Sequence, residues 1–216
     1  MIRSCALIAA LAIASFGAVT SSARAEWWGQ FAVQDPALTP GVPDVAITHE
    51  HNTAMVVWPE SDGSNMRVKA ARFEPNSSTP IDIGYVSAGG SNASLPRIAI
   101  NDQDIAMIIW HNDTTNTIDG ATVAENATSS TPLGALSIAG AAEASINSNR
   151  SSNFVATWTQ SPGVGSVVQA VRLDATGPLG AVETLTSGPA LATHPQAIVE
   201  SDVSAQRPQT VVGWKQ

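Results

Sequence analysis

Cysteine is almost absent from this chain of 216 residues, which contains Cys5 and no other. Cys5 precedes the apolar run 6–16, inside a segment that we expect to be removed on export. Without further thiols the remaining chain cannot form disulfide bonds, thiolate metal sites or a cysteine nucleophile. Its stability must therefore come from packing.

Positive charge is also scarce, with 10 Lys and Arg against 18 Asp and Glu and a formal net charge of −8. Removal of Arg3 and Arg24 with the leader would make the balance more negative still. Binding to nucleic acid or to an anionic membrane surface depends on clusters of cationic side chains. We therefore predict no nucleic-acid partner.

The only long apolar run, 6–16, has about 11 residues, too few for a helix to cross a hydrocarbon layer of roughly 30 Å. Arg3 lies before the run and Ala23-Arg24-Ala25 follows it, which is the pattern of a secretory signal peptide with its cleavage site. We predict that residues 1–25 are this signal peptide and that the rest is secreted or periplasmic, without membrane insertion. A buried N-terminal helix is the alternative.

What the sequence does contain is a repeat. Four short runs of β-branched or apolar residues each end in tryptophan, at intervals of 48 to 56 residues: Ala54–Trp58, Ala106–Trp110, Phe154–Trp158 and Thr210–Trp214. Internal similarity at such a period is typical of repeat architectures.

Companion segments recur around each tryptophan run. One lies upstream: Pro43–Ile47, Pro96–Ile100, Ala144–Asn147 and Pro195–Val199. One lies downstream: Val68–Arg72, Ile118–Thr122 and Val168–Arg172. A fourth begins at proline, at Pro80–Gly84, Pro132–Leu136 and Pro178–Val182, with Gln30–Gln34 as its counterpart at the start. We expect the proline-initiated segment to open each unit.

The segments are short, rich in Val, Ile and Thr, and bounded by Gly, Pro, Asn and Asp, which indicates strands rather than helices. Four antiparallel strands in about 50 residues have the size of one propeller blade. Residues 26–216 are thus predicted to form about four repeats, the last lacking its final strand. We expect Trp58, Trp110, Trp158 and Trp214 to form the structural core between neighbouring repeats, because a tryptophan buries a large apolar area.

The motifs resemble those of secreted bacterial β-propeller repeat proteins of uncharacterised function. The resemblance covers residues 30–216 and rests on Trp-terminated runs, Val-x-Ala-x-Arg segments such as Val168–Arg172, Gly177–Gly180 and Pro96–Ile100. It implies an all-β fold, a β-propeller that is partial or incompletely closed. A β-sandwich is the alternative, since regular short strands are typical of that fold too.

Candidate metal ligands are few. His49 and His51 alternate in a loop, so in an extended segment they would face the same side, as two zinc ligands could. Oxygen donors for Ca²⁺ gather in two turns, at Asp102 and Asp104 and at Asp113 and Asp119. Ordinary turn chemistry is the competing interpretation, and no cofactor is evident.

No catalytic motif accompanies the repeat. There is no Gly-x-Ser-x-Gly elbow, and the single tyrosine, Tyr85, lies in no recognisable motif. We predict a secreted, non-catalytic propeller module that binds a protein or a glycan. The alternative is a fragment of a propeller glycoside hydrolase or lyase.

Overall fold

The computed structural model describes residues 41–48, 50–75, 77–149, 152–161, 163–186, 191–199 and 210–216. The chain divides into two units, Met1–Phe31 and Ala32–Gln216, and all described residues belong to the second. The described residues do not include the predicted signal peptide, the segment Gln30–Gln34 or His49. Among the described residues, no helix is long and apolar enough to cross a membrane.

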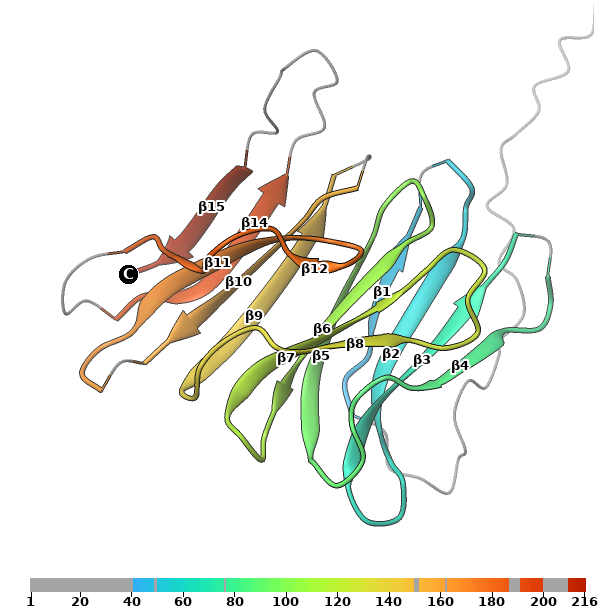
Figure 1. Cartoon of the computed structure of the whole chain (residues 1–216), viewed down its shortest axis with the longest axis horizontal. Helices are drawn as coiled ribbons and strands as arrows, with labels where there is room; N and C mark the ends of the chain where they lie inside the picture. The colour runs from blue at the N-terminus through green and yellow to red at the C-terminus, as the bar shows by residue number, and fades with distance from the viewer. Residues whose placement is uncertain are drawn as a thin grey trace, which may run out of the picture. The chain divides into compact units, whose positions relative to one another are not determined.

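The described residues form four antiparallel sheets, whose strands are joined in chain order (Figure 1). The first contains β1 (Asp44–Ile47), β2 (Ala54–Ser61), β3 (Met66–Phe73) and β4 (Ile81–Tyr85). The second contains β5 (Ala93–Ile100), β6 (Ala106–Asn112), β7 (Thr117–Val123) and β8 (Thr131–Ala135). The third contains β9 (Ala141–Ser148), β10 (Phe154–Gln160) and β11 (Val167–Asp174), which pairs with the short β12 (Gly177–Pro178) and β13 (Glu183–Thr184). The last contains β14 (Thr193–Val199) and β15 (Thr210–Lys215).

The proline-initiated strands close a sheet instead of opening the next one, so the predicted order within the unit was wrong. β4 pairs with β3, with Lys69 opposite Tyr85, and β8 pairs with β7, with Asp119 opposite Ala135. The order of segments along the chain does not tell which neighbour a strand pairs with, whereas a short connection favours pairing with the strand just made. The last sheet therefore has two described strands, not the three that were expected.

Neighbouring sheets pack face to face through apolar side chains. One cluster joins Met55 and Val57 of the first sheet to Ile108 and Trp110 of the second. The next joins Met107 and Ile109 of the second sheet to residues of the third, among them Trp158. Since successive residues of a strand point to opposite faces, β6 is buried on both of its faces.

The four tryptophans occupy the fifth position of β2, β6, β10 and β15. Trp58, Trp110 and Trp158 are buried, with 2%, 4% and 0% of their surface exposed. Trp214 differs from the expectation of a core residue, because 39% of it is exposed. The physical reason is that no described strand covers the second edge of β15.

The prediction of an all-β, propeller-type chain is confirmed. Three sheets of at least four strands, each a meander, packed face to face in chain order, have the arrangement of propeller blades. A sandwich would have two sheets instead. Among the described strands none pairs the first sheet with the last, so the sheets do not close into a ring there.

Candidate functional site

Charged and aromatic side chains gather on one face of the first sheet. Trp58 is opposite Lys69, Glu60 opposite Arg67, and Lys69 opposite Tyr85, and residues opposite each other in a sheet point to the same side. This face is the reverse of the one that carries Met55 and Val57 into the core. We call the set the Glu60 cluster; its members are Trp58, Glu60, Arg67, Lys69, Asp82 and Tyr85.

Glu60 is the centre of this cluster and is almost fully buried, with 2% of its surface exposed. Its Oε2 accepts a hydrogen bond of 3.1 Å from the indole N–H of Trp58. Its Oε1 lies 3.3 Å from the ammonium of Lys69 and 3.5 Å from the hydroxyl of Tyr85. A buried carboxylate is costly unless it is paired and hydrogen-bonded, and Trp58 and Lys69 meet that need.

Lys69 links the buried carboxylate to the surface. Its ammonium lies 3.7 Å from Oδ2 of Asp82, whose side chain is 66% exposed. Burial alone would lower the pKa of Lys69, but the hydrogen bond to Glu60 and the charge of Asp82 outweigh it and raise that pKa. Lys69 therefore remains a cation throughout the neutral range.

Tyr85 is held in the cluster as a neutral phenol. Its hydroxyl lies 3.1 Å from the carbonyl oxygen of Ser61, to which it donates, and the guanidinium of Arg67 lies 4.4 Å from the centre of its ring. Burial, followed by the nearby charge of Glu60, raises the pKa of Tyr85. A phenol with a raised pKa is a hydrogen-bond donor and a poor nucleophile.

The turn between β2 and β3 fixes the guanidinium of Arg67. Asp62 accepts hydrogen bonds from the backbone N–H groups of Asn65 and Ser64, at 2.8 and 2.9 Å, and these lower the pKa of Asp62. Arg67 lies 3.7 Å from Asp62 and donates to the carbonyl oxygen of Ser87. The arrangement is typical of an Asx turn that orients the flanking strands.

The chemistry available to this site is hydrogen bonding to a polar ligand. Glu60 and Asp82 lie within about 7 Å of each other, since both contact the ammonium of Lys69. Enzymes that hydrolyse glycosides use two carboxyl groups separated by about 5–9 Å, one of which must carry a proton at neutral pH. Here the ammonium of Lys69 lies between the two carboxyl groups and contacts both of them.

The structure brings together two of the proposed metal ligands. Nδ1 of His51 lies 3.0 Å from Oδ2 of Asp104, across the loops that join β1 to β2 and β5 to β6. Asp102 lies in the same loop as Asp104. The described residues contain no group of three or more His, Cys, Asp or Glu side chains placed to hold a metal ion. His49 lies outside the description, so the metal site stays a prediction.

The other two proposed ligands, Asp113 and Asp119, have different hydrogen-bond partners. Oδ1 of Asp113 accepts from the hydroxyl of Ser94 at 2.7 Å and lies 2.6 Å from Nδ1 of His111. Asp119 instead accepts from Asn112 and Thr117, at 2.8 and 2.7 Å. Each carboxylate thus stabilises the hairpin between β6 and β7.

Ser94, His111 and Asp113 are not arranged as a nucleophilic triad. A triad needs the serine hydroxyl at the free ring nitrogen of the histidine. Here Ser94 bonds to the aspartate, and Nε2 of His111 lies 3.0 Å from the amide oxygen of Asn116. These three residues therefore form a hydrogen-bonded surface turn.

Reasoning from the sequence did not single out Glu60. The feature of the sequence that could have indicated it is the alternation of β2, which puts Glu60 on the same face as Trp58, two residues earlier. Arg67 and Lys69 alternate with Val68 and Ala70 in the sequence, so both point to one side of β3. The pairing of β2 with β3, which brings those charges to Glu60, is not written in either strand alone.

Comparison with known proteins identifies no family. The sequence matches no protein-family model and no curated protein. An exo-β-1,3-galactanase from Phanerochaete chrysosporium is 12% identical with a TM-score of 0.47, over 76% of this chain and 42% of that one. A fucose-specific lectin from Aleuria aurantia is 11% identical with a TM-score of 0.46, over 81% and 60%.

A third solved structure, an endo-arabinase from Bacteroides thetaiotaomicron, is 13% identical with a TM-score of 0.44, over 90% of this chain and 78% of that one. The chain spans less than two thirds of the length of the galactanase and of the lectin. With TM-scores below 0.5, no functional residue can be transferred from these proteins. The site must be argued from its own geometry.

Proposed function

We propose that this chain is a secreted, non-catalytic binding module of the β-propeller type, and that its ligand is a glycan bound at the Glu60 cluster. The observation that supports this proposal is the ion pair of Lys69 and Asp82, on the exposed side of the cluster. The buried carboxylate of Glu60 holds the ammonium of Lys69, and Asp82 lies 3.7 Å from the same ammonium. A donor beside an acceptor suits neighbouring hydroxyl groups, which both donate and accept hydrogen bonds.

The balance of charge also favours a neutral, polar ligand. Two cations, Arg67 and Lys69, lie among three carboxylates, Glu60, Asp62 and Asp82, and each cation pairs with at least one of them. A strongly anionic ligand would gain little here, since the whole chain has a net charge of −8. A protein that presents hydroxyl and amide groups is the alternative ligand.

Glycan-array screening of the purified chain, followed by calorimetric titration of the best ligand, tests this proposal. We expect Asp82→Asn to weaken binding about tenfold, because one charge-assisted hydrogen bond is lost. The matched control is Glu125→Gln, an exposed carboxylate in the turn after β7, which should leave affinity unchanged. Binding that is indifferent to Asp82→Asn contradicts the site.

The hydrolase alternative is favoured by one observation, the proximity of Glu60 and Asp82. Incubation with the same glycans, followed by analysis of reducing ends, distinguishes the two functions. A binding module leaves the glycans intact. Product formation that Glu60→Gln abolishes would establish the hydrolase instead.

A further inference from the structure

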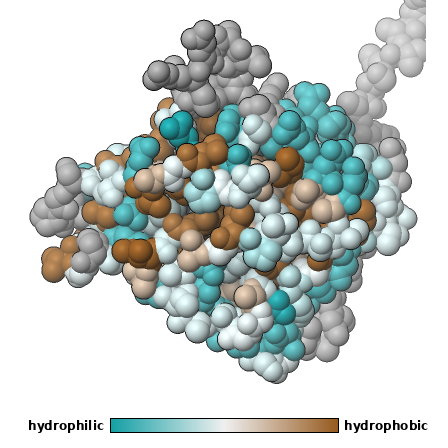
Figure 2. Space-filling model, viewed as in Figure 1, coloured by the Kyte–Doolittle hydropathy of each residue, from teal (hydrophilic) through white to brown (hydrophobic). Residues whose placement is uncertain are grey.

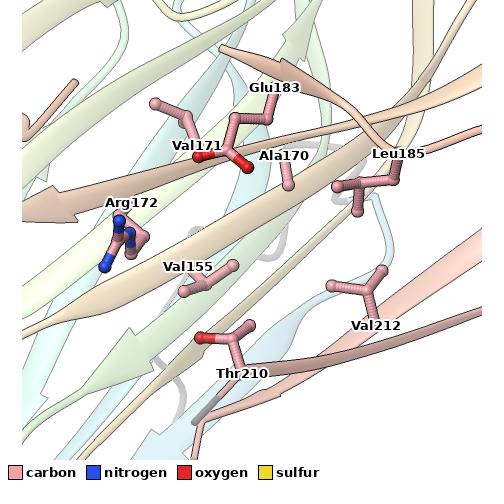
Figure 3. Close-up of a pocket in the computed structure, with 8 residues that line it drawn as sticks. All are labelled: Val155, Ala170, Val171, Arg172, Glu183, Leu185, Thr210 and Val212. Atoms are coloured by element: carbon pink, nitrogen blue, oxygen red, sulfur yellow. The ribbon is translucent and has the colours of Figure 1, made fainter. Parts of the chain in front are cut away.

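Polar and apolar surfaces lie in different parts of this molecule. A groove of about 260 Å³ lies beside the third sheet, and the side chains that line it include Val155, Leu185 and Val212 (Figure 3). Apolar residues gather on the surface around this region, whereas the side of the first sheet is mainly hydrophilic (Figure 2). A glycan needs hydrogen-bond donors and acceptors along its length, so a longer glycan would extend over the first sheet rather than into the groove.

Arg67 is placed to meet a second sugar residue on the first sheet. It lies two residues before Lys69 on β3 and points to the same face. Two residues of a strand span about 7 Å, which is comparable with the step between neighbouring sugar residues of an extended glycan. The ring of Tyr85 contacts both cations, since its centre lies 4.4 Å from the guanidinium of Arg67 and 5.8 Å from the ammonium of Lys69.

The guanidinium of Arg67 has N–H groups that the fold does not use. Its Nη2 donates to the carbonyl oxygen of Ser87. Its Nη1 lies 3.7 Å from Oδ2 of Asp62, which is within ion-pair distance but too long for a hydrogen bond. Because the side chain is 19% exposed, Nη1 is available to donate to a ligand at the surface.

The loop between β4 and β5 approaches this nitrogen. A Cβ atom at Gly89 would lie 4.0 Å from Nη1 of Arg67, and a Cβ atom at Gly90 would have nothing within 4 Å. Both glycines are exposed, and the backbone N–H groups of residues 88–91 make no hydrogen bond to any backbone that the structure describes. Free donors of the guanidinium and of the loop therefore lie side by side next to open space.

This loop is longer than its counterpart in the next sheet. Ser87 and Ser137 each accept a hydrogen bond from the third strand of their own sheet, so they occupy equivalent positions. The carbonyl oxygens of Asn92 and Gly140 likewise accept from a turn of the following sheet. Four residues lie between Ser87 and Asn92, but two lie between Ser137 and Gly140. The extra length contains the two glycines.

Arg67 is a second departure from the repeat at the same place. It pairs with Glu60, two residues after the tryptophan of β2. The residues at this position in the next two sheets are Thr117 and Val167, which carry no charge. Departures from a regular pattern that the fold itself does not need are expected at functional sites, and these two lie next to each other.

We propose that Arg67 and the loop of residues 88–91 form a second subsite, so that the Glu60 cluster binds a glycan of at least two sugar residues. This inference rests on the proposed function, because it extends the glycan site at Lys69 and Asp82. The first sugar residue lies at Lys69 and Asp82, and the next one accepts hydrogen bonds from Arg67 and from the backbone of the loop. Hydroxyl and ring oxygens are acceptors, so a neutral sugar suits these donors.

Calorimetric titration with glycans of increasing length tests the second subsite. The probes are glucose, mannose and galactose and their β-1,4-linked oligosaccharides of two to four residues. In a series that binds, we expect the affinity to rise about tenfold from one residue to two, because hydrogen bonds to Arg67 and to the loop are added. From two residues to four, the affinity should change little.

The substitution Gly89→Leu blocks the subsite and removes no contact of the fold. Gly89 does not have a positive φ, and its Cβ would meet Nη1 of Arg67 at an ordinary contact distance, so the variant is expected to fold. We expect it to abolish the tenfold gain for the second sugar residue and to leave the affinity for the monosaccharide unchanged. The matched control is Gly180→Leu, at an exposed glycine of the third sheet with nothing within 4 Å, which should change neither affinity.

Failure of this inference can be distinguished from failure of the proposed function. Equal affinity for one and for two sugar residues, no binding of any of these probes, or a gain that Gly89→Leu leaves intact would each overturn the second subsite. Binding on the glycan array that Asp82→Asn weakens would then still support the first site. An array without any bound glycan would overturn the proposed function, and the second subsite with it.

Discussion

Trp158 and Trp214 occupy the same position in equivalent strands and have opposite surroundings. Trp158 is fully buried, and the neighbouring β11 supplies Gln169 to its indole N–H. Trp214 is 39% exposed on a strand that has one described neighbour. The Trp-terminated run is similar in both, so the difference shows that the third strand, and not the run itself, makes a tryptophan part of the core.

Trp58 represents a third situation. It has its third strand, β3, yet its indole N–H donates to Glu60 of its own strand instead of to the strand opposite. The face of β2 that carries Trp58 also carries the charges of the Glu60 cluster. In β6 and β10, by contrast, Trp110 and Trp158 pack against apolar residues of the preceding sheet. The same element thus supports an apolar interface inside the stack and a polar surface on the first sheet.

The largest expected effect is that of Trp158→Ala. Removing a fully buried tryptophan should lower the free energy of unfolding by about 3–5 kcal/mol, and Trp110→Ala, 4% exposed, should do nearly the same. Trp214→Ala should cost less, about 1–3 kcal/mol, because 39% of its surface is already exposed. Urea denaturation of the three variants measures the differences. Equal losses would show that Trp214 is buried in solution.

A smaller effect is expected for Glu60→Ala. The substitution leaves the N–H of Trp58 and the ammonium of Lys69 without their buried acceptor, and we expect a loss of about 2–3 kcal/mol. Asp82→Asn is the matched control, and it should change stability by less than about 0.5 kcal/mol because Asp82 is 66% exposed. A Glu60→Ala variant as stable as the parent would mean that the buried contacts of Glu60 do not contribute to stability.

Alkaline pH tests the same cluster through its titration. The pKa values of Lys69 and Tyr85 are both raised in the folded chain. Their contribution to stability is therefore complete below their ordinary values of 10.5 and 10.0 and is lost as the pH rises through the folded values. Thermal melts between pH 8 and 11 should show falling stability, with a shallower fall for Tyr85→Phe. Parallel curves for the two proteins would contradict the assignment to Tyr85.

The smallest effect is expected for the ion pair of His51 and Asp104, which joins loops of the first and second sheets. His51 is 54% exposed, and an ion pair to Asp104 at such a site contributes about 0–0.5 kcal/mol. His51→Gln should therefore leave the melting temperature almost unchanged. If calcium or zinc in the buffer raised the melting temperature of the unmodified chain but not that of His51→Gln, the result would indicate a metal at this loop.

The strands were predictable from the sequence and their grouping was not. The runs that end at Trp58, Trp110, Trp158 and Trp214 are all strands, as the β-branched residues and the turn residues around them indicate. The strand after Pro80 was assigned to the wrong sheet, because a strand carries no local mark of its hydrogen-bonded neighbour. Glu60 escaped notice for the same reason: its partners Lys69 and Tyr85 come from two other strands.

The sequence by itself determined that this chain is all-β, because strand propensity and the period of two are properties of short segments. Only the tertiary structure decided where each sheet begins and ends, which charges surround Glu60 and why Trp214 is exposed. Those features depend on which strands become neighbours. That choice is made by packing between residues far apart in the chain, and a repeated motif has the same local pattern whether or not its neighbour is present.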